Sequence, residues 1–273
     1  MSIVWFNGDF EPGTVPLDAG DRGFLLGDGL FETIAVRNGN PIWLADHMDR
    51  MENSAAELGI PFDRIKTVSG VVDVLQKSNA GSEVLRITLS RGKTGRGLAS
   101  SGGTPSLLIT LASFASTPLE PCRLKISSIR RNEHAPSSRL KTLSYIDAIM
   151  AAREVADEAD EALMLNVVGN VASTTIANIF LLKDGKFITP SLDQGILSGI
   201  TRQKIMALRS VVERPIAPNE LYGADAVFLC NSLRSVRPVS QINGIIVKSQ
   251  SLEKLHHDLI DLMTKGNSHE ILH

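Results

Sequence analysis

Lys141 differs from most other lysines of the chain in its sequence surroundings. It lies among small and apolar residues in the segment Ser137-Ser-Arg-Leu-Lys-Thr-Leu-Ser144, just before a predicted helix, whereas Lys183 and Lys186 flank a polar turn. A lysine amine that is withdrawn from water loses its charge more easily, and the neutral amine is the form that makes a Schiff base. Lys141 is therefore a candidate for covalent catalysis. The alternative is a surface lysine near a helix start.

A glycine-bearing segment leads into a second predicted helix. It reads Gly195-Ile-Leu-Ser-Gly-Ile-Thr201, so a hydroxyl residue follows the glycines at the point where the helix opens. The first backbone N–H groups of a helix lack partners within the helix, and they attract anions such as phosphate. The segment is a candidate phosphate site, and an ordinary glycine turn with Thr201 as helix cap is the alternative.

Two further glycine-rich segments carry arginines. Arg22 lies in Asp21–Gly29, and Arg91 and Arg96 lie in Ser90–Gly97. A guanidinium fork suits the capture of a carboxylate. Neither segment has the residues of a P-loop or of a dinucleotide-binding turn, so nucleotide binding is not indicated. Solvated surface loops are the alternative interpretation.

Strands and helices are predicted on both sides of these candidates. Apolar runs bounded by turn residues indicate strands, and apolar residues at three- and four-residue steps indicate helices. The predicted strands are Ile3–Phe6, Phe31–Arg37, Val84–Leu89, Leu107–Leu111, Arg123–Ile129, Ala162–Leu165, Ile179–Leu182 and Ala226–Leu229. The predicted helices are Ala45–Leu58, Ile65–Gln76, Ser144–Ala159 and Arg202–Val212.

The order of these elements predicts an α+β protein with two domains. Strands outnumber helices and do not alternate regularly with them, which favours sheets that are at least partly antiparallel. The segment 112–121 is small, polar and proline-bearing, and is typical of a linker. We therefore expect an N-terminal domain at 1–111, a linker at 112–121, and a C-terminal domain at 122–273 that carries Lys141.

Composition limits the classes of function. The net charge of -2 and the aromatic content of 5% do not favour a nucleic-acid partner. Cys122 and Cys230 are far apart, with no further ligands at metal spacing, so neither a disulfide framework nor a metal site is expected. No signal peptide and no membrane-spanning apolar run is evident. We expect a cytoplasmic protein without nucleic-acid or membrane partners.

Several segments, taken in order, resemble the class IV aminotransferases. The similarity runs from near the N-terminus to about Val239. The segments that carry it are Asp21–Thr33, His47–Met51, Leu140–Tyr145, Asn178–Phe180, Thr189–Arg202 and Phe228–Val239. The resemblance implies pyridoxal 5'-phosphate (PLP) fold type IV, which has two α/β subdomains with mixed sheets, a PLP cofactor and a homodimer.

The resemblance also implies roles for individual residues. Lys141 would bond the cofactor covalently and then serve as the general base. The cofactor phosphate would be held by Arg50, Thr201 and Ser232 together with the backbone at Ile200. Such anchoring fixes the ring, so that the reacting C–H bond can be aligned.

Substrate contacts are implied less directly. Arg91 and Arg96 would clamp a substrate carboxylate, and Arg22 would act across a dimer interface. Tyr145 would hydrogen-bond near the cofactor, or it would only pack against its helix.

The chain departs from the family pattern at Ser173. Five residues before the Asn178 motif, the family has a glutamate that pairs with the pyridine nitrogen of the cofactor, whereas this chain has Ser173. A carboxylate keeps that nitrogen protonated, and a hydroxyl supplies no such charge. Altered chemistry, an acid from another segment, or a degraded enzyme would each account for the change.

Two reactions within the family fit the sequence, and we predict the first because it is the more common activity of the family. The first is transamination between a small α-amino acid (D-amino or branched-chain) and a 2-oxo acid. The second is the release of pyruvate and 4-aminobenzoate by a 4-amino-4-deoxychorismate lyase, which Leu229–Leu233, Leu192–Gln194 and Ser173 favour. A PLP-binding or cofactor-free homologue without catalysis is the alternative from a different class.

Overall fold

The chain forms two compact units, each described by itself. The computed structural model describes residues 2–79, 81–99, 102–115, 120–248 and 251–266. Unit 1 comprises Met1–Ser116, Lys141–Ser144 and Met263–His273, and unit 2 comprises Thr117–Leu140 and Tyr145–Leu262. This division differs from the expected domains at 1–111 and 122–273, because the lysine-bearing segment 141–144 and the segment 263–273 are both grouped with unit 1. Part of the expected linker, residues 116–119, lies outside the described residues.

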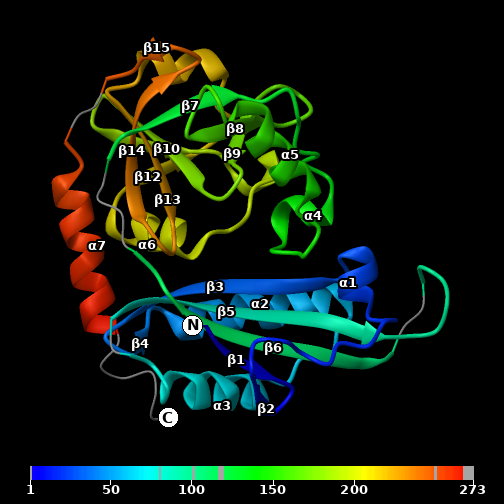
Figure 1. Ribbon diagram of the computed structural model, residues 1–273. Helices are drawn as coiled ribbons and strands as arrows, with labels where there is room; N and C mark the ends of the chain where they lie inside the picture. Colours follow the sequence, from blue (N-terminus) through cyan, green and yellow to red (C-terminus); the bar gives the residue numbers. More distant parts are fainter. Residues whose placement is uncertain (1, 80, 100–101, 116–119, 249–250, 267–273) are drawn as a thin grey trace. The chain divides into compact units, whose positions relative to one another are not determined.

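Unit 1 is an antiparallel sheet that packs against two helices (Figure 1). The strand order is β2-β1-β6-β5-β3-β4. Helix α2 packs on β3, and α3 packs on β6 and β1. The elements are β1 (Ile3–Phe6), β2 (Asp9–Glu11), α1 (Arg22–Leu26), β3 (Gly29–Arg37), β4 (Asn40–Pro41), α2 (Leu44–Leu58), α3 (Arg64–Leu75), β5 (Ser82–Lys93) and β6 (Thr104–Ser113).

Unit 2 is built on a mixed sheet. Its strand order is β12-β11-β10-β13-β14-β7-β8-β9, with β15 paired to β14. The pairs β14–β7, β7–β8 and β11–β12 are parallel, and the remaining pairs are antiparallel. The strands are β7 (Cys122–Ile126), β8 (Glu161–Leu165), β9 (Val171–Thr174), β10 (Asn178–Lys183), β11 (Lys186–Thr189), β12 (Val211–Glu213), β13 (Ala226–Asn231), β14 (Ser235–Ile242) and β15 (Ile245–Ile246).

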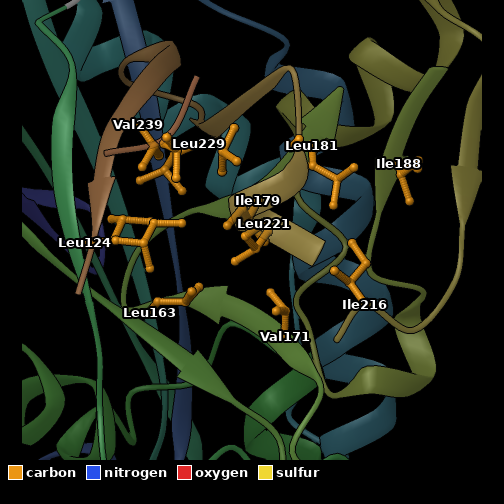
Figure 2. Packing of buried hydrophobic residues seen from close by; sticks show 14 of the residues in the cluster. Leu124, Leu163, Val171, Ile179, Leu181, Ile188, Ile216, Leu221, Leu229 and Val239 are labelled. Carbon is orange, nitrogen blue, oxygen red and sulfur yellow. The ribbon is translucent and has the colours of Figure 1, made fainter. Parts of the chain in front are cut away.

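Helices and an apolar core complete unit 2. The longer helices are α5 (Ile146–Val155) and α6 (Ile200–Leu208), beside α4 (Pro136–Arg139) and the 3₁₀ turns Leu192–Gln194 and Pro218–Gly223. Figure 2 shows the side chains of Leu124, Leu163, Ile179 and Leu229 converging in a hydrophobic core cluster of unit 2. Buried aliphatic residues from several strands thus stabilise the sheet whose strand β9 carries Ser173. The last helix, α7, spans Glu253–Gly266.

The expected α+β class and the partly antiparallel sheets are confirmed, but several predicted boundaries are wrong. The helix predicted over Ser144–Ala159 spans Ile146–Val155, and the strand predicted over Arg123–Ile129 ends at Ile126. The helix predicted over Arg202–Val212 ends at Leu208, and Val211 begins strand β12. The cause is tertiary, because Val211 pairs with Phe187 on β11 and the β-branched pair Val211-Val212 suits a strand. No helix among the described ranges is long and apolar enough to cross a membrane.

Candidate active site

Backbone pairing fixes the segment that carries Lys141. Strand β4 covers β3 only at Val36 and Arg37, which leaves the start of the same β3 edge open. There, Phe31 donates its N–H to the carbonyl of Lys141 at 3.0 Å, and Leu143 donates to Gly29 at 2.9 Å. The segment therefore behaves as a short additional edge strand of unit 1. A side chain in such a ladder is positioned more firmly than one in a free loop.

The Lys141 side chain lies beside an aromatic ring. Its Nζ is 4.3 Å from the centre of the Phe31 ring, and the guanidinium carbon of Arg86 is 3.9 Å from the same centre. Both distances are in the range of cation–π contacts. Thr33 pairs with Arg86 in the sheet, so Phe31 and Arg86 are placed on the same face. Sequence reasoning missed Arg86, which lies between the apolar residues Leu85 and Ile87 of strand β5.

A buried ion network holds Arg50. Glu32, which is 1% exposed, accepts Arg50 Nε at 2.8 Å and Arg50 Nη2 at 2.6 Å in a bidentate pair. The second oxygen of Glu32 also lies 2.6 Å from His47 Nδ1. Burial lowers the pKa of His47, so the neutral ring with Nδ1–H as donor fits this contact. The network presents the Arg50 guanidinium in one fixed orientation.

Breaking this network is expected to destabilise the protein. Burial opposes the charge of Glu32, but Arg50 and His47 outweigh it and hold the Glu32 pKa at about 2, below its ordinary value of 4.5. Glu32→Gln would leave Arg50 without its carboxylate, which costs about 3–5 kcal/mol for a buried pair. Urea unfolding at pH 7 measures the loss, and exposed Glu57→Gln on α2 is the matched control.

The same network predicts how stability depends on pH. Because the Glu32 pKa is depressed on folding, its contribution is fully present above about pH 4.5 and is lost as the pH falls toward 2. The wild type should therefore lose on the order of 3 kcal/mol over this window that Glu32→Gln does not lose. Identical acid dependence of the two proteins would contradict the assignment.

Arg22 and Arg91 share one carboxylate. Asp28 accepts Arg22 Nε at 2.7 Å and Arg91 Nε at 2.8 Å. Arg22 also donates to the carbonyls of Gly97 and Leu98, and Arg91 donates to carbonyls on the turn after α2. These bonds tie the two glycine-rich segments together. A role for Arg22 and Arg91 in binding a substrate carboxylate stays a prediction.

In unit 2, the start of α6 is closely packed. Asn178 Nδ2 donates to the carbonyl of Leu197 at 2.9 Å, and a Cβ placed on Gly199 would lie 2.1 Å from Asn178 Oδ1. Only glycine therefore fits at position 199, where it forms the N-cap of α6. Thr201 is therefore not the N-cap, because it lies one residue inside the helix, after Ile200. The asparagine thus fixes the course of the loop that enters the helix.

The environment of the Thr201 hydroxyl indicates an anion site. Its Oγ1 is enclosed and has no hydrogen-bond partner among the described residues. It stands in the first turn of α6, where backbone N–H groups have no partners within the helix. A buried hydroxyl without a partner is costly, and a phosphate oxygen would satisfy both it and the helix N–H groups.

A β-bulge sets the direction of Ser173. Met164 pairs with Ser173 but Leu165 pairs with Val171, so Ala172 is the extra residue in β9. The bulge places Ser173 on the same face as Met164. Ser173 is 5% exposed, and its Oγ donates to the carbonyl of Thr174 at 2.9 Å. No carboxylate of the described residues hydrogen-bonds to it.

Glu161, the acid on the neighbouring strand β8, lies on the other face of the sheet from Ser173. Glu161 stands two residues before Leu163, which pairs with Thr174, so Glu161 belongs to the opposite face from Ser173. It accepts a hydrogen bond from Thr175 Oγ1 at 2.9 Å, and burial raises its pKa. The hypothesis that an acid from another segment serves in place of Ser173 is therefore not supported for Glu161.

The remaining candidates occupy turns and loops. Tyr145 is the partly buried N-cap residue of α5, and Ser232 lies in the turn between β13 and β14. Arg96 is exposed on the loop after β5. Unit 1 thus contains Lys141, Arg50, Arg22, Arg91 and Arg96, and unit 2 contains Tyr145, Ser173, Ile200, Thr201 and Ser232.

The chain belongs to the amino-transferase class IV family, whose model matches residues 29–242. It is 34% identical to the aminodeoxychorismate lyase of Vibrio harveyi, over 89% of this chain and 92% of that protein. It is 28% identical to a putative branched-chain-amino-acid aminotransferase of Methanocaldococcus jannaschii, over 96% of each chain. A crystal structure of a putative 4-amino-4-deoxychorismate lyase from Legionella pneumophila shares 34% identity, with a TM-score of 0.85 over 93% of this chain and 96% of that one.

Membership of this family makes the protein a PLP-dependent enzyme and confirms PLP fold type IV. The residues present fit the cofactor. The unpartnered Thr201 hydroxyl at the start of α6 suits its phosphate, as does the Arg50 guanidinium held by Glu32. Lys141, fixed on the edge of β3, is the amine that would bond the aldehyde carbon of PLP.

Proposed function

We propose that the enzyme catalyses elimination from an amino-carboxylate, releasing pyruvate and 4-aminobenzoate from 4-amino-4-deoxychorismate. The observation that carries the proposal is that the Ser173 hydroxyl donates to the carbonyl of Thr174 and that no carboxylate of the described residues hydrogen-bonds to it. The 34% identity to the Vibrio harveyi lyase over nearly the whole chain supports it.

The chemistry explains why this absence favours elimination. Bound PLP withdraws electrons from the carbon that bears the amino group. In transamination the negative charge left on that carbon must stay stabilised until a proton returns at another carbon. A protonated pyridine nitrogen stabilises this charge. In elimination the Lys141 amine takes the C4 proton and the C3–O bond breaks. The leaving enolpyruvate gains a proton to become pyruvate, while the six-membered ring becomes aromatic.

Arg96 is the arginine that we assign to a substrate carboxylate. The guanidinium groups of Arg22 and Arg91 are bonded to Asp28 and to backbone carbonyls, whereas Arg96 is exposed and makes no hydrogen bond to a described residue. An arginine that must pair with a substrate has to keep its donors available. The substrate named above offers two carboxylates.

A product assay tests the proposed function. Purified enzyme loaded with PLP is given 4-amino-4-deoxychorismate, and 4-aminobenzoate is followed by its fluorescence and pyruvate by lactate dehydrogenase. We expect the two products in equal amounts. Amino donors paired with pyruvate or 2-oxoglutarate are assayed in parallel. Faster turnover of an amino donor than of the lyase substrate would overturn the proposal.

Transamination of a small α-amino acid is the second candidate. It is favoured by the match to the putative branched-chain-amino-acid aminotransferase over 96% of this chain. The same Lys141 amine would take the proton from the α-carbon and return it elsewhere on the reacting group.

We also propose that the enzyme is a homodimer in the cytoplasm and that α1 forms part of the contact. Phe24, Leu25 and Leu26 are consecutive apolar residues with exposed fractions of 73%, 57% and 52%. The helix is held firmly, because Asp21 caps it and accepts hydrogen bonds from Ser90 and Ser106. A fixed, exposed apolar cluster is typical of an interface.

Leu25→Asp is expected to convert the dimer to a monomer at micromolar concentration. Burying each apolar side chain stabilises an interface by about 1.5–3 kcal/mol, and a buried carboxylate opposes it further. Light scattering after gel filtration measures the mass. Ile65→Asp on α3, where the side chain is 85% exposed, is the matched control and should remain dimeric. A dimeric Leu25→Asp would contradict this interface.

A further inference from the structure

Arg131 is a partly buried cation close to Ser173. Its backbone is fixed to β8, because Arg131 N donates to the carbonyl of Leu165 at 2.9 Å and Arg131 forms a parallel bridge to Asn166. Its Nη2 lies 3.4 Å from the carbonyl oxygen of Thr174. The Ser173 hydroxyl donates to the same oxygen at 2.9 Å. The hydroxyl and the guanidinium therefore meet at one acceptor.

Within the described ranges, no carboxylate hydrogen-bonds to the Arg131 guanidinium. Arg131 Nε is enclosed and lacks a hydrogen-bond partner among the described residues. Burial lowers the pKa of Arg131, and Tyr145 and Asp147 at the start of α5 act in the opposite direction. Asp147 is exposed, and Glu161 belongs to the other face of β8 and β9. An enclosed charge with an unsatisfied donor indicates that a further acceptor is to be bound there.

We propose that Arg131 is the charged group at the pyridine-nitrogen end of the bound cofactor and keeps that nitrogen unprotonated. In this family the partner of the nitrogen projects from the position of Ser173. Here that position offers a hydroxyl, and the adjacent charge is positive. A positive charge within about 4–6 Å disfavours the protonation of a neighbouring base, and typically lowers its pKa by about 1–3.

This assignment deepens the proposed function. An unprotonated ring nitrogen withdraws electrons less strongly. The chain's own residues therefore favour a reaction in which a C–O bond breaks and its electron pair leaves with the oxygen. Arg131 thus acts as a residue that sets reaction specificity through the cofactor, while the proton transfer itself remains with Lys141.

The protonation of the nitrogen can be read without substrate. The holoenzyme is prepared with PLP that carries ¹⁵N in the ring, and the ¹⁵N chemical shift is followed from pH 5 to 9. We expect the shift of an unprotonated pyridine throughout in the wild type. Arg131→Gln should raise the pH at which the nitrogen titrates by about 1–3. Arg131→Lys, which keeps the charge, should stay close to the wild type.

Arg130→Gln is the matched control, because Arg130 is the neighbouring exposed arginine. It should leave the ¹⁵N shift unchanged. A protonated nitrogen in the wild type, or equal titration in Arg131→Gln and wild type, would overturn the proposal. Circular dichroism and the retained PLP content identify a variant that has lost its fold, and Arg131→Lys then decides the question. Failure of the lyase assay alone would affect the proposed function and not this result.

Discussion

Replacement of Lys141 by alanine is expected to abolish turnover and to remove the covalent bond between protein and cofactor. General base catalysis alone contributes about 10²–10⁴-fold, and covalent capture of the cofactor adds to it, so we expect a loss of at least about 10³-fold. Borohydride reduction of the wild-type holoenzyme followed by peptide mapping measures the attachment directly. The modified peptide should contain Lys141.

The control for this experiment is Lys186→Ala. Lys186 is an exposed lysine at the start of β11, so its removal should change neither the absorbance of the bound cofactor nor turnover. Attachment of the cofactor at any other lysine would contradict the assignment of Lys141. Retained turnover in Lys141→Ala, with cofactor bound, would contradict it equally.

Ser173→Glu is expected to raise the rate of half-transamination relative to elimination. The new carboxylate would stabilise a protonated ring nitrogen, and each pKa unit of such support corresponds to about 1.4 kcal/mol. Part of this energy should lower the barrier to proton transfer, which gives a change of about 10- to 100-fold in the ratio. The effect should be larger together with Arg131→Gln, because the guanidinium then no longer neutralises the carboxylate.

Ser173→Gln separates charge from size in this test. Glutamine has nearly the shape of glutamate but lacks its charge, so it should leave the ratio of the two reactions close to that of the wild type. Single-turnover measurements with an amino-acid donor and with an elimination substrate give the ratio. The same ratio for Ser173→Glu and Ser173→Gln, with cofactor bound in both, would show that charge at this position has no influence.

Much of the fold could be predicted from local patterns. Strand β3 follows an apolar run and helices α2 and α3 follow helical spacing, and all three lie close to the expected ranges. Strand β12 could not be predicted, because only its pairing with β11 decides between helix and strand at Val211 and Val212.

The residues of the candidate site could likewise be predicted only in part. Lys141, Arg50, Thr201 and Ser173 are visible in the sequence, because their motifs are local and the chemistry of each residue type is specific. Their partners are not visible: Glu32 lies 18 residues from Arg50, and Arg131 lies 43 residues from Thr174. Such contacts depend on which strands pair and in which register.

The sequence by itself determined the family, the cofactor and the hydroxyl residue at position 173. Only the tertiary structure decided that segment 141–144 joins the β3 edge, that Glu161 belongs to the face opposite Ser173, and that Arg131 stands beside Ser173. The physical reason is that residue type sets what chemistry a side chain can perform. Strand register and the bulge at Ala172 set the face on which that chemistry is available.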